Sequence, residues 1–91
     1  MDNKVVIMFG TEEKEVHDVY MHLSNSQYDV SFNKMHRRSL AFNITAAKEQ
    51  RDDAMNEAIE YCAKKNYDEI IAVGTHCQKI KDIIADRTNN L

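Results

Sequence analysis

The sequence predicts one α/β (α+β) domain with the element order βαββαβα, and three observations support this. Two segments are apolar at every position and end in Gly-Thr, two alternate between apolar and polar residues, and three carry apolar residues at helical spacing. The 91 residues (1–91) have room for a single hydrophobic core. Because 43% of the residues are hydrophobic and 30% are charged, a folded domain is expected rather than a disordered chain.

The first strand is expected at residues 5–9, where every side chain is apolar, as in a strand buried on both faces. Gly10 allows a turn, and Thr11 is a suitable N-cap for a helix with acidic residues in its first turn. This helix has one apolar face with the spacing i, i+3, i+4 and i+7, formed by Val16, Val19, Tyr20 and Leu23.

Two half-buried strands are expected next, at residues 28–33 and 40–45, because apolar and polar side chains alternate in both. The loop between them, residues 34–38, is far too short for a parallel crossover, which needs about a dozen residues or more. The two strands are therefore expected to form an antiparallel hairpin.

The last part of the chain predicts a helix, a strand and a further helix. The second helix is expected at about residues 47–65, with Asn66 as a left-handed terminator. Residues 69–73 are expected to form another strand that is apolar on both faces, and Thr75 with Gln78 matches a capping box at the start of the last helix. The buried side of that helix is expected to carry Cys77, Ile80 and Ile84, with Ile83 beside them.

The connections also predict the strand directions. A strand–helix–strand crossover returns the chain parallel and a hairpin reverses it, so the last strand should run opposite to the first. The expected fold is ferredoxin-like, a four-stranded mixed sheet in the order 2-3-1-4 with two helices on one face and an extra C-terminal helix. We expect the extra helix to cover the opposite face beside the last strand. Alternatively, a second copy covers the sheet edge or the open face, as a homodimer.

Composition excludes some classes of function. A net charge of -3 argues against a general nucleic-acid binder, which needs a basic face. The chain has two cysteines, no apolar run long enough to span a membrane and no leader pattern at its start. A cytoplasmic protein without a membrane segment is therefore expected.

Residues 54–76, AMNEAIEYCAKKNYDEIIAVGTH, resemble the late helix–strand segment of universal stress proteins. In that family, a strand ending in Val-Gly-Thr-His leads into a glycine-rich loop that binds nucleotide phosphates. The resemblance implies a nucleotide or phosphate site at Gly74, Thr75 and His76, where amides at a helix start can bind an anion. The chain departs from the family at residues 77–81, which contain no glycine. The predicted strand directions also separate the two Gly-Thr turns, whereas that family opens both onto one crevice.

The element order also resembles that of an RNA recognition motif. The segment RSLAFNIT matches the third strand of that motif only at Arg38, Ala41 and Phe42, and the first strand has no aromatic residue at the corresponding position. Direct nucleic-acid binding is therefore not expected.

Metal and thiol chemistry are not expected either. His17 and His22 are five residues apart and do not share a helix face, and Cys62 and Cys77 lie on different elements. Cys77 lies near a helix start, which favours a thiolate, but its place on the apolar side favours packing. No metal and no cofactor are predicted.

Basic residues gather at the predicted hairpin tip. This cluster is either a solvated turn or an anion site, because arginine offers a planar fork to a phosphate or carboxylate. The candidate residues in it are Arg37 and Arg38, with Lys34 and His36 beside them.

The first two predicted helices are acidic. Residues 11–24 and 47–65 together hold nine acids and five bases. If the helices lie side by side, their outer surface suits a basic protein partner, although an ordinary solvated surface has the same composition. The expected function is a small non-enzymatic interaction or regulatory module, and the alternative is the nucleotide or phosphate binder described above. The expected partner-binding residues are Glu12, Glu13, Glu15, Glu49, Asp52, Asp53, Glu57 and Glu60.

Overall fold

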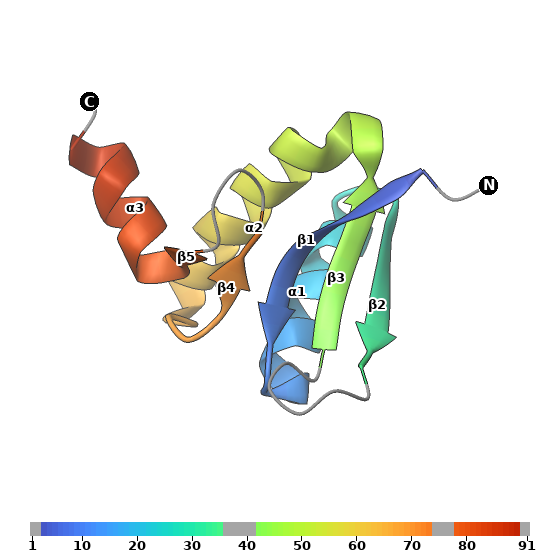
Figure 1. Cartoon of the computed structure of the whole chain (residues 1–91), viewed down its shortest axis with the longest axis horizontal. Coiled ribbons are helices and arrows are strands. Elements are labelled where there is room, and N and C mark those ends of the chain that lie inside the picture. Colours follow the sequence, from blue (N-terminus) through green and yellow to red (C-terminus); the bar gives the residue numbers. More distant parts are fainter. Residues whose placement is uncertain (1–2, 36–41, 74–77, 90–91) are drawn as a thin grey trace.

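The computed structural model describes residues 3–35, 42–73 and 78–89, which form one sheet with helices on one side (Figure 1). The strands are β1 (Lys4–Gly10), β2 (Val30–Lys34), β3 (Phe42–Ala47), β4 (Ile71–Ala72) and β5 (Gln78–Lys79). The helices are α1 (Glu13–Asn25), the short 3-10 helix η1 (Lys48–Gln50), α2 (Arg51–Lys65) and α3 (Ile80–Asn89).

The strand order is β2-β3-β1-β4-β5, which confirms the predicted 2-3-1-4 arrangement and the ferredoxin-like fold class with an extra C-terminal helix. β1 runs antiparallel to β4, as the connections predicted. Two details differ from the expected four-stranded mixed sheet. The short strand β5 adds a fifth strand beside β4, and the neighbouring strands described here all pair antiparallel. The reason is that each crossover joins strands separated by another strand, so parallel strands are never neighbours.

The core lies between the sheet and the helices α1 and α2. β3 places Phe42, Ile44 and Ala46 towards the helices, and their partners on β1 include Met8 and Gly10. A bulge between Val6 and Met8 shifts the register. As a result, consecutive residues of β1 are both fully buried, at 0% exposure for Ile7 and Met8. In the part of the chain described, no helix is long and apolar enough to cross a membrane.

Gly10 is needed for close packing rather than for an unusual backbone angle. It is the last residue of β1, it is buried, and its φ is not positive. A Cβ at this position would overlap the Val16 side chain of α1. The prediction that Thr11 caps the helix was wrong, because α1 begins at Glu13 and its N-cap Glu12 makes no side-chain capping bond. Acidic residues in the first turn stabilise this end through the helix dipole instead.

The second helix begins later than the sequence predicts. The chain stays extended through Ala47, whose N–H donates to Asp29 O at 2.9 Å, and Lys48 N–H donates to Asn3 O at 2.7 Å. These bonds prolong the β3 ladder, so α2 begins only at Arg51, after η1. Its end agrees with the prediction, since Asn66 adopts the left-handed conformation with φ 62.

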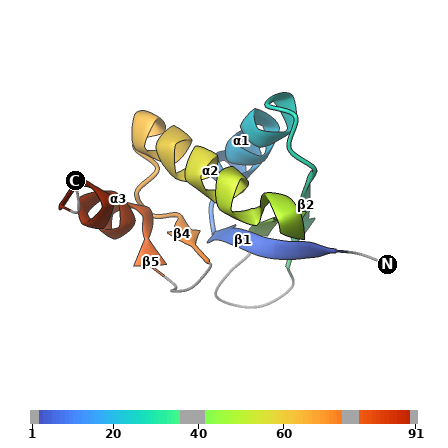
Figure 2. The ribbon, with the colours of Figure 1, turned by 90° about the horizontal axis from the view of Figure 1, so that it is seen from above.

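The third helix lies on the other side from the one expected. α3 packs beside α2 at the margin of the helical layer, not on the opposite face of the sheet (Figure 2). The predicted capping box is also wrong, because Gln78 belongs to β5 and α3 begins at Ile80. β5 pairs with the outer edge of β4, and α3 follows directly after β5. Thr75 and Cys77 lie outside the described residues.

Candidate functional site

The acidic residues of the two helices do not form one continuous surface. α1 and α2 lie side by side but start at opposite ends of the layer, because β1 and β3, which precede them, are antiparallel (Figure 1). The acids of the first turn of α1 therefore lie at the end where α2 finishes with Lys64 and Lys65. The acids at the start of α2 lie at the other end. The antiparallel packing divides the predicted partner-binding residues into two groups.

The group on α1 is solvent-accessible. Glu12 and Glu13 are exposed, and Glu15 is half-buried. Glu15 is near enough to Cys62 and Tyr67 to contribute to raising the pKa of both side chains. Glu15 therefore faces α2, whereas Glu12 and Glu13 lie at the exposed entrance to the helix.

The group on α2 forms a stripe along the helix. Asp53, Glu57 and Glu60 follow the spacing i, i+4 and i+7, which places them on one face. Glu49, Asp52, Asp53 and Glu60 are exposed, and Glu57 is half-buried. Three of these acids already have partners among the described residues. Arg51 contacts Asp52 at 3.2 Å, His22 contacts Glu57 at 2.8 Å, and Arg87 lies 3.7 Å from Glu60.

A second cluster joins α1 to α2 and was not predicted. Tyr61 and Tyr67 donate to the two carboxylate oxygens of Asp18, at 2.9 and 2.7 Å. Beside them, His22 Nε2 lies 2.8 Å from Glu57 Oε2, and its ring stacks on Tyr61 with centroids 4.1 Å apart. We call Asp18, His22, Glu57, Tyr61 and Tyr67 the seam cluster.

Hydrogen bonding shifts the pKa values in the seam cluster in opposite directions. Burial raises the pKa of Asp18, but hydrogen bonds from Tyr67 and Tyr61 outweigh it and bring the pKa below its ordinary value. The hydrogen bond to Asp18, together with burial, raises the pKa of Tyr67 to about 12. Burial and the same carboxylate raise the pKa of Tyr61. The cluster is therefore stable as a carboxylate with two neutral phenols.

Two signals in the sequence could have revealed this cluster. Asp18 and His22 are spaced i, i+4 on the first helix, and Glu57 and Tyr61 are spaced i, i+4 on the second. Each pair occupies one flank of its helix. That the flanks face each other depends on how the helices are rotated, which only their packing on the sheet determines.

Cys62 is unsuited to nucleophilic chemistry. Its side chain is fully buried at 0% exposure, and burial, with Glu15 and Asp18 nearby, raises the pKa of the thiol to about 12. Among the described residues, no group of three His, Cys, Asp or Glu side chains could hold a metal ion.

The candidate anion-binding residues Gly74, Thr75, His76, Arg37 and Arg38 all lie outside the described residues. The strands that lead to the two Gly-Thr turns are described. Because β1 and β4 are antiparallel, β1 ends at one end of the sheet and β4 points towards the other. The structure thus confirms that β1 and β4 run in opposite directions.

Comparisons of the chain with protein-family models, with curated proteins and with solved structures found no match for it.

Proposed function

We propose that the protein is a small cytoplasmic, non-enzymatic interaction module that binds a basic protein through its acidic helical layer. The observation that carries the proposal is that two helices rich in acids pack side by side and expose most of those acids. The α2 stripe is the centre of this surface, and Glu12 and Glu13 on α1 are a second contact point at the far end. By covering the basic surface of its partner, the protein would regulate what that surface binds.

The charge arrangement supports binding more than stability. Exposed ion pairs such as Arg51–Asp52 contribute about 0 to 1 kcal/mol, so these acids add little to folding. A cluster of one sign instead steers an oppositely charged partner and increases its association rate. Asp53 and Glu49 have no ion-pair partner among the described residues, so they are the most available for binding.

The test is retention of basic proteins by the immobilised chain at low and high salt. Wild-type protein should retain a specific partner at low salt and release it at high salt. The double variant Asp52→Lys/Asp53→Lys should lose that partner, because it reverses two exposed charges in the first turn of α2. The matched control Glu12→Lys/Glu13→Lys makes the same change of net charge at the α1 end, and it should weaken retention less.

Circular dichroism of each variant verifies that the fold is intact. If the amount of retained partner is the same at low and high salt and in the charge-reversed variants, the proposal is contradicted. Equal loss in the two double variants would mean that net charge alone attracts the partner, which contradicts a localised surface.

Two parts of the expectation remain predictions. The nucleotide or phosphate site at Gly74, Thr75 and His76 is checked by native mass spectrometry of freshly purified protein, in which a retained nucleotide would support it. We also propose that the protein forms a homodimer.

A further inference from the structure

The two edges of the sheet differ in how well they resist further strand pairing. β5 is only two residues long and carries Lys79, and short, charged edges pair poorly with other strands. β2 has five residues, and within the described part of the chain no strand pairs with its outer side. Its one charged side chain, Lys34, is at the last residue of the strand, and the four residues before it carry no charge. β2 is therefore the edge that remains competent to pair.

The hydrogen bonds of β2 show which backbone groups are available. Ala47 N–H donates to Asp29 O, so Asp29 forms a hydrogen-bonded pair with β3. In an antiparallel ladder such pairs alternate, so Ser31 and Asn33 also face β3. The N–H and C=O groups of Val30, Phe32 and Lys34 consequently point away from the sheet.

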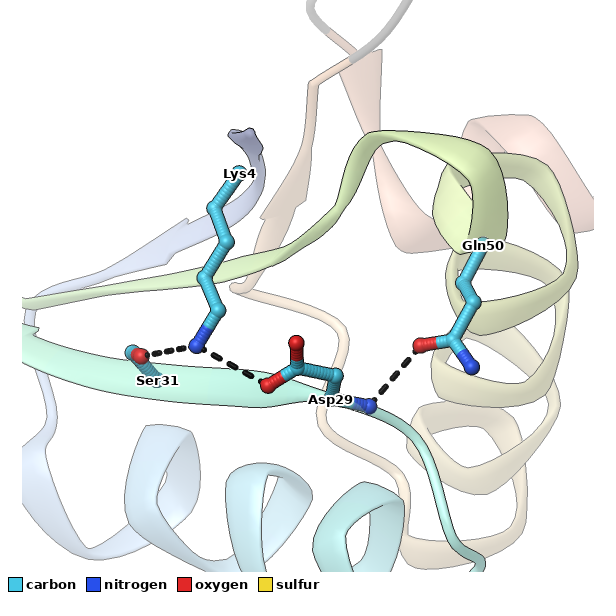
Figure 3. A network of polar contacts seen from close by, with 4 residues as sticks. All are labelled: Lys4, Asp29, Ser31 and Gln50. Carbon is cyan, nitrogen blue, oxygen red and sulfur yellow. Dashed lines mark hydrogen bonds and ion pairs between the residues drawn. The ribbon is translucent and has the colours of Figure 1, made fainter. Parts of the chain in front are cut away.

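A polar network holds this edge in place. Lys4 Nζ lies 2.7 Å from Ser31 Oγ and 3.1 Å from Asp29 Oδ1, and Gln50 Oε1 accepts from Asp29 N–H at 2.8 Å (Figure 3). These contacts tie the start of β2 to β1 and to η1. An edge fixed in its extended form loses little conformational entropy when another strand pairs with it.

The flank of α1 above β2 carries two aromatic rings and an exposed methionine. His17 and Tyr20 pack on Phe32, with ring centroids 5.1 and 5.9 Å apart. Met21, one turn after His17, is 42% exposed, and it is the one large apolar side chain classed as exposed among the described residues. The unpaired edge and the exposed apolar flank lie on the same side of the molecule.

We infer that a second copy of this chain pairs with β2, so that two antiparallel β2 strands join the sheets about a two-fold axis at Ser31. The inference specifies the interface of the proposed homodimer and does not depend on the acidic α2 surface. In an antiparallel symmetric pair, the axis must pass through two copies of the same residue. The choice between candidate residues follows from which side chains then meet.

Pairing about Ser31 brings like side chains together. Val30 lies opposite the partner's Phe32, a β-branched and aromatic pair of the kind that stabilises sheets. On the other face, Asp29 lies opposite the partner's Asn33, and Ser31 meets its own copy. Shifting the axis to Phe32 would instead place Val30 against Lys34 and Asp29 against Met35, which mixes apolar with charged side chains. The sequence of β2 is thus self-complementary in one register.

The α1 helices add contact area to this strand pair. Because α1 packs over β2 and β3, two copies would place the helix axes about 10 to 15 Å apart, given strand spacings of about 4.8 Å. Side chains such as Met21 can span that gap. Contact between the helices is needed because a pair of strand edges alone buries too little surface for a stable dimer.

The register is tested by cysteine cross-linking of the full chain under mild oxidation. Ser31→Cys should give a covalent dimer, since identical residues at a non-hydrogen-bonded pair have Cα atoms about 4.5 Å apart, within disulfide range. Asn33→Cys is the matched control on the same strand face. Its two copies would lie about 14 Å apart and should not cross-link. Wild-type protein reports the background from the native cysteines.

Sedimentation measures the dimer without a cross-link. Val30→Pro removes an outward N–H that makes no bond to β3, and Met21→Lys places a charge on the flank. Each should weaken dimerisation about tenfold or more, whereas Met21→Leu should not. Amide exchange at Val30, Phe32 and Lys34 should slow as protein concentration rises.

Equal cross-linking of Ser31→Cys and Asn33→Cys would overturn the register. A wild-type protein that is monomeric at all concentrations would overturn the dimer and leave the edge to an extended segment of another protein. Neither result bears on the acidic surface, because its variants alter different residues.

Discussion

The contact between α1 and α2 and the contact between α2 and α3 are built differently. The first contact has an apolar interior that includes the fully buried Leu23 and Cys62. Towards the surface, the hydrogen bonds of the seam cluster link the two helices. The second is flanked by two clefts of 320 and 260 Å³, both lined by Ala63 and Ile84. Its ion pair, Arg87 with Glu60, is long at 3.7 Å.

This difference indicates where the stability of the fold is concentrated. Close packing and hydrogen bonds to a charged group contribute more than a partly open contact with an exposed ion pair. We therefore expect β1, α1, β2, β3 and α2 to unfold as one unit, with α3 able to separate from α2 beforehand.

The largest expected change in stability comes from truncating an apolar side chain at each of the two contacts. Leu23→Ala should lower the free energy of unfolding by about 3 kcal/mol, because its cavity forms in a fully packed region. Ile84→Ala should cost about 1 kcal/mol, since this half-buried side chain already borders both clefts. Urea unfolding measures both values, and equal losses would contradict the comparison.

The next effect tests the seam cluster. Asp18→Asn should lower the free energy of unfolding by about 2 kcal/mol, because two tyrosines lose a charged acceptor. Tyr67→Phe removes one of these bonds and should cost less.

The pH dependence follows from the lowered pKa of Asp18. A carboxyl whose pKa is lower in the folded state stabilises the protein above its unfolded pKa, and this stability is lost as pH falls through the folded pKa. Unfolding curves from neutral to acidic pH should therefore be flatter in Asp18→Asn than in wild type. Parallel curves would show that Asp18 makes no contribution to acid sensitivity.

The smallest effect is expected at the α2–α3 contact. Glu60→Gln should change the free energy of unfolding by less than about 0.5 kcal/mol, because the ion pair is long and exposed. Hydrogen exchange provides the sharper measurement. The amides of α3 should exchange faster than those in the middle of α1, and similar protection of the two helices would show that α3 is an integral part of the folding unit.

Most of the strand arrangement could be predicted from the sequence. The short link between two alternating strands required an antiparallel hairpin, and two crossovers around it determined the order and the direction of β1 relative to β4. The buried face of the first helix was also predicted correctly from its spacing, since Val16, Val19 and Leu23 are all buried. The prediction of element ends was weaker, since α1 begins two residues after Thr11 and backbone pairing keeps Ala47 in β3.

The seam cluster and the position of α3 could not be predicted in the same way. Asp18 and Tyr67 are 49 residues apart, and their contact depends on the rotation of two helices over the sheet. α3 follows directly after β5, a strand of two residues whose pairing with β4 leaves no periodic signal in the sequence.

The sequence alone determined the composition of the helical layer, its net acidity and the topology of the sheet, because periodicity and loop length act locally along the chain. Only the tertiary structure divided the acids into two groups, by packing α1 and α2 in opposite directions. It also revealed that Gly10 is required by the approach of Val16. Such contacts join residues that no local pattern connects, so they become apparent only when the chain is folded.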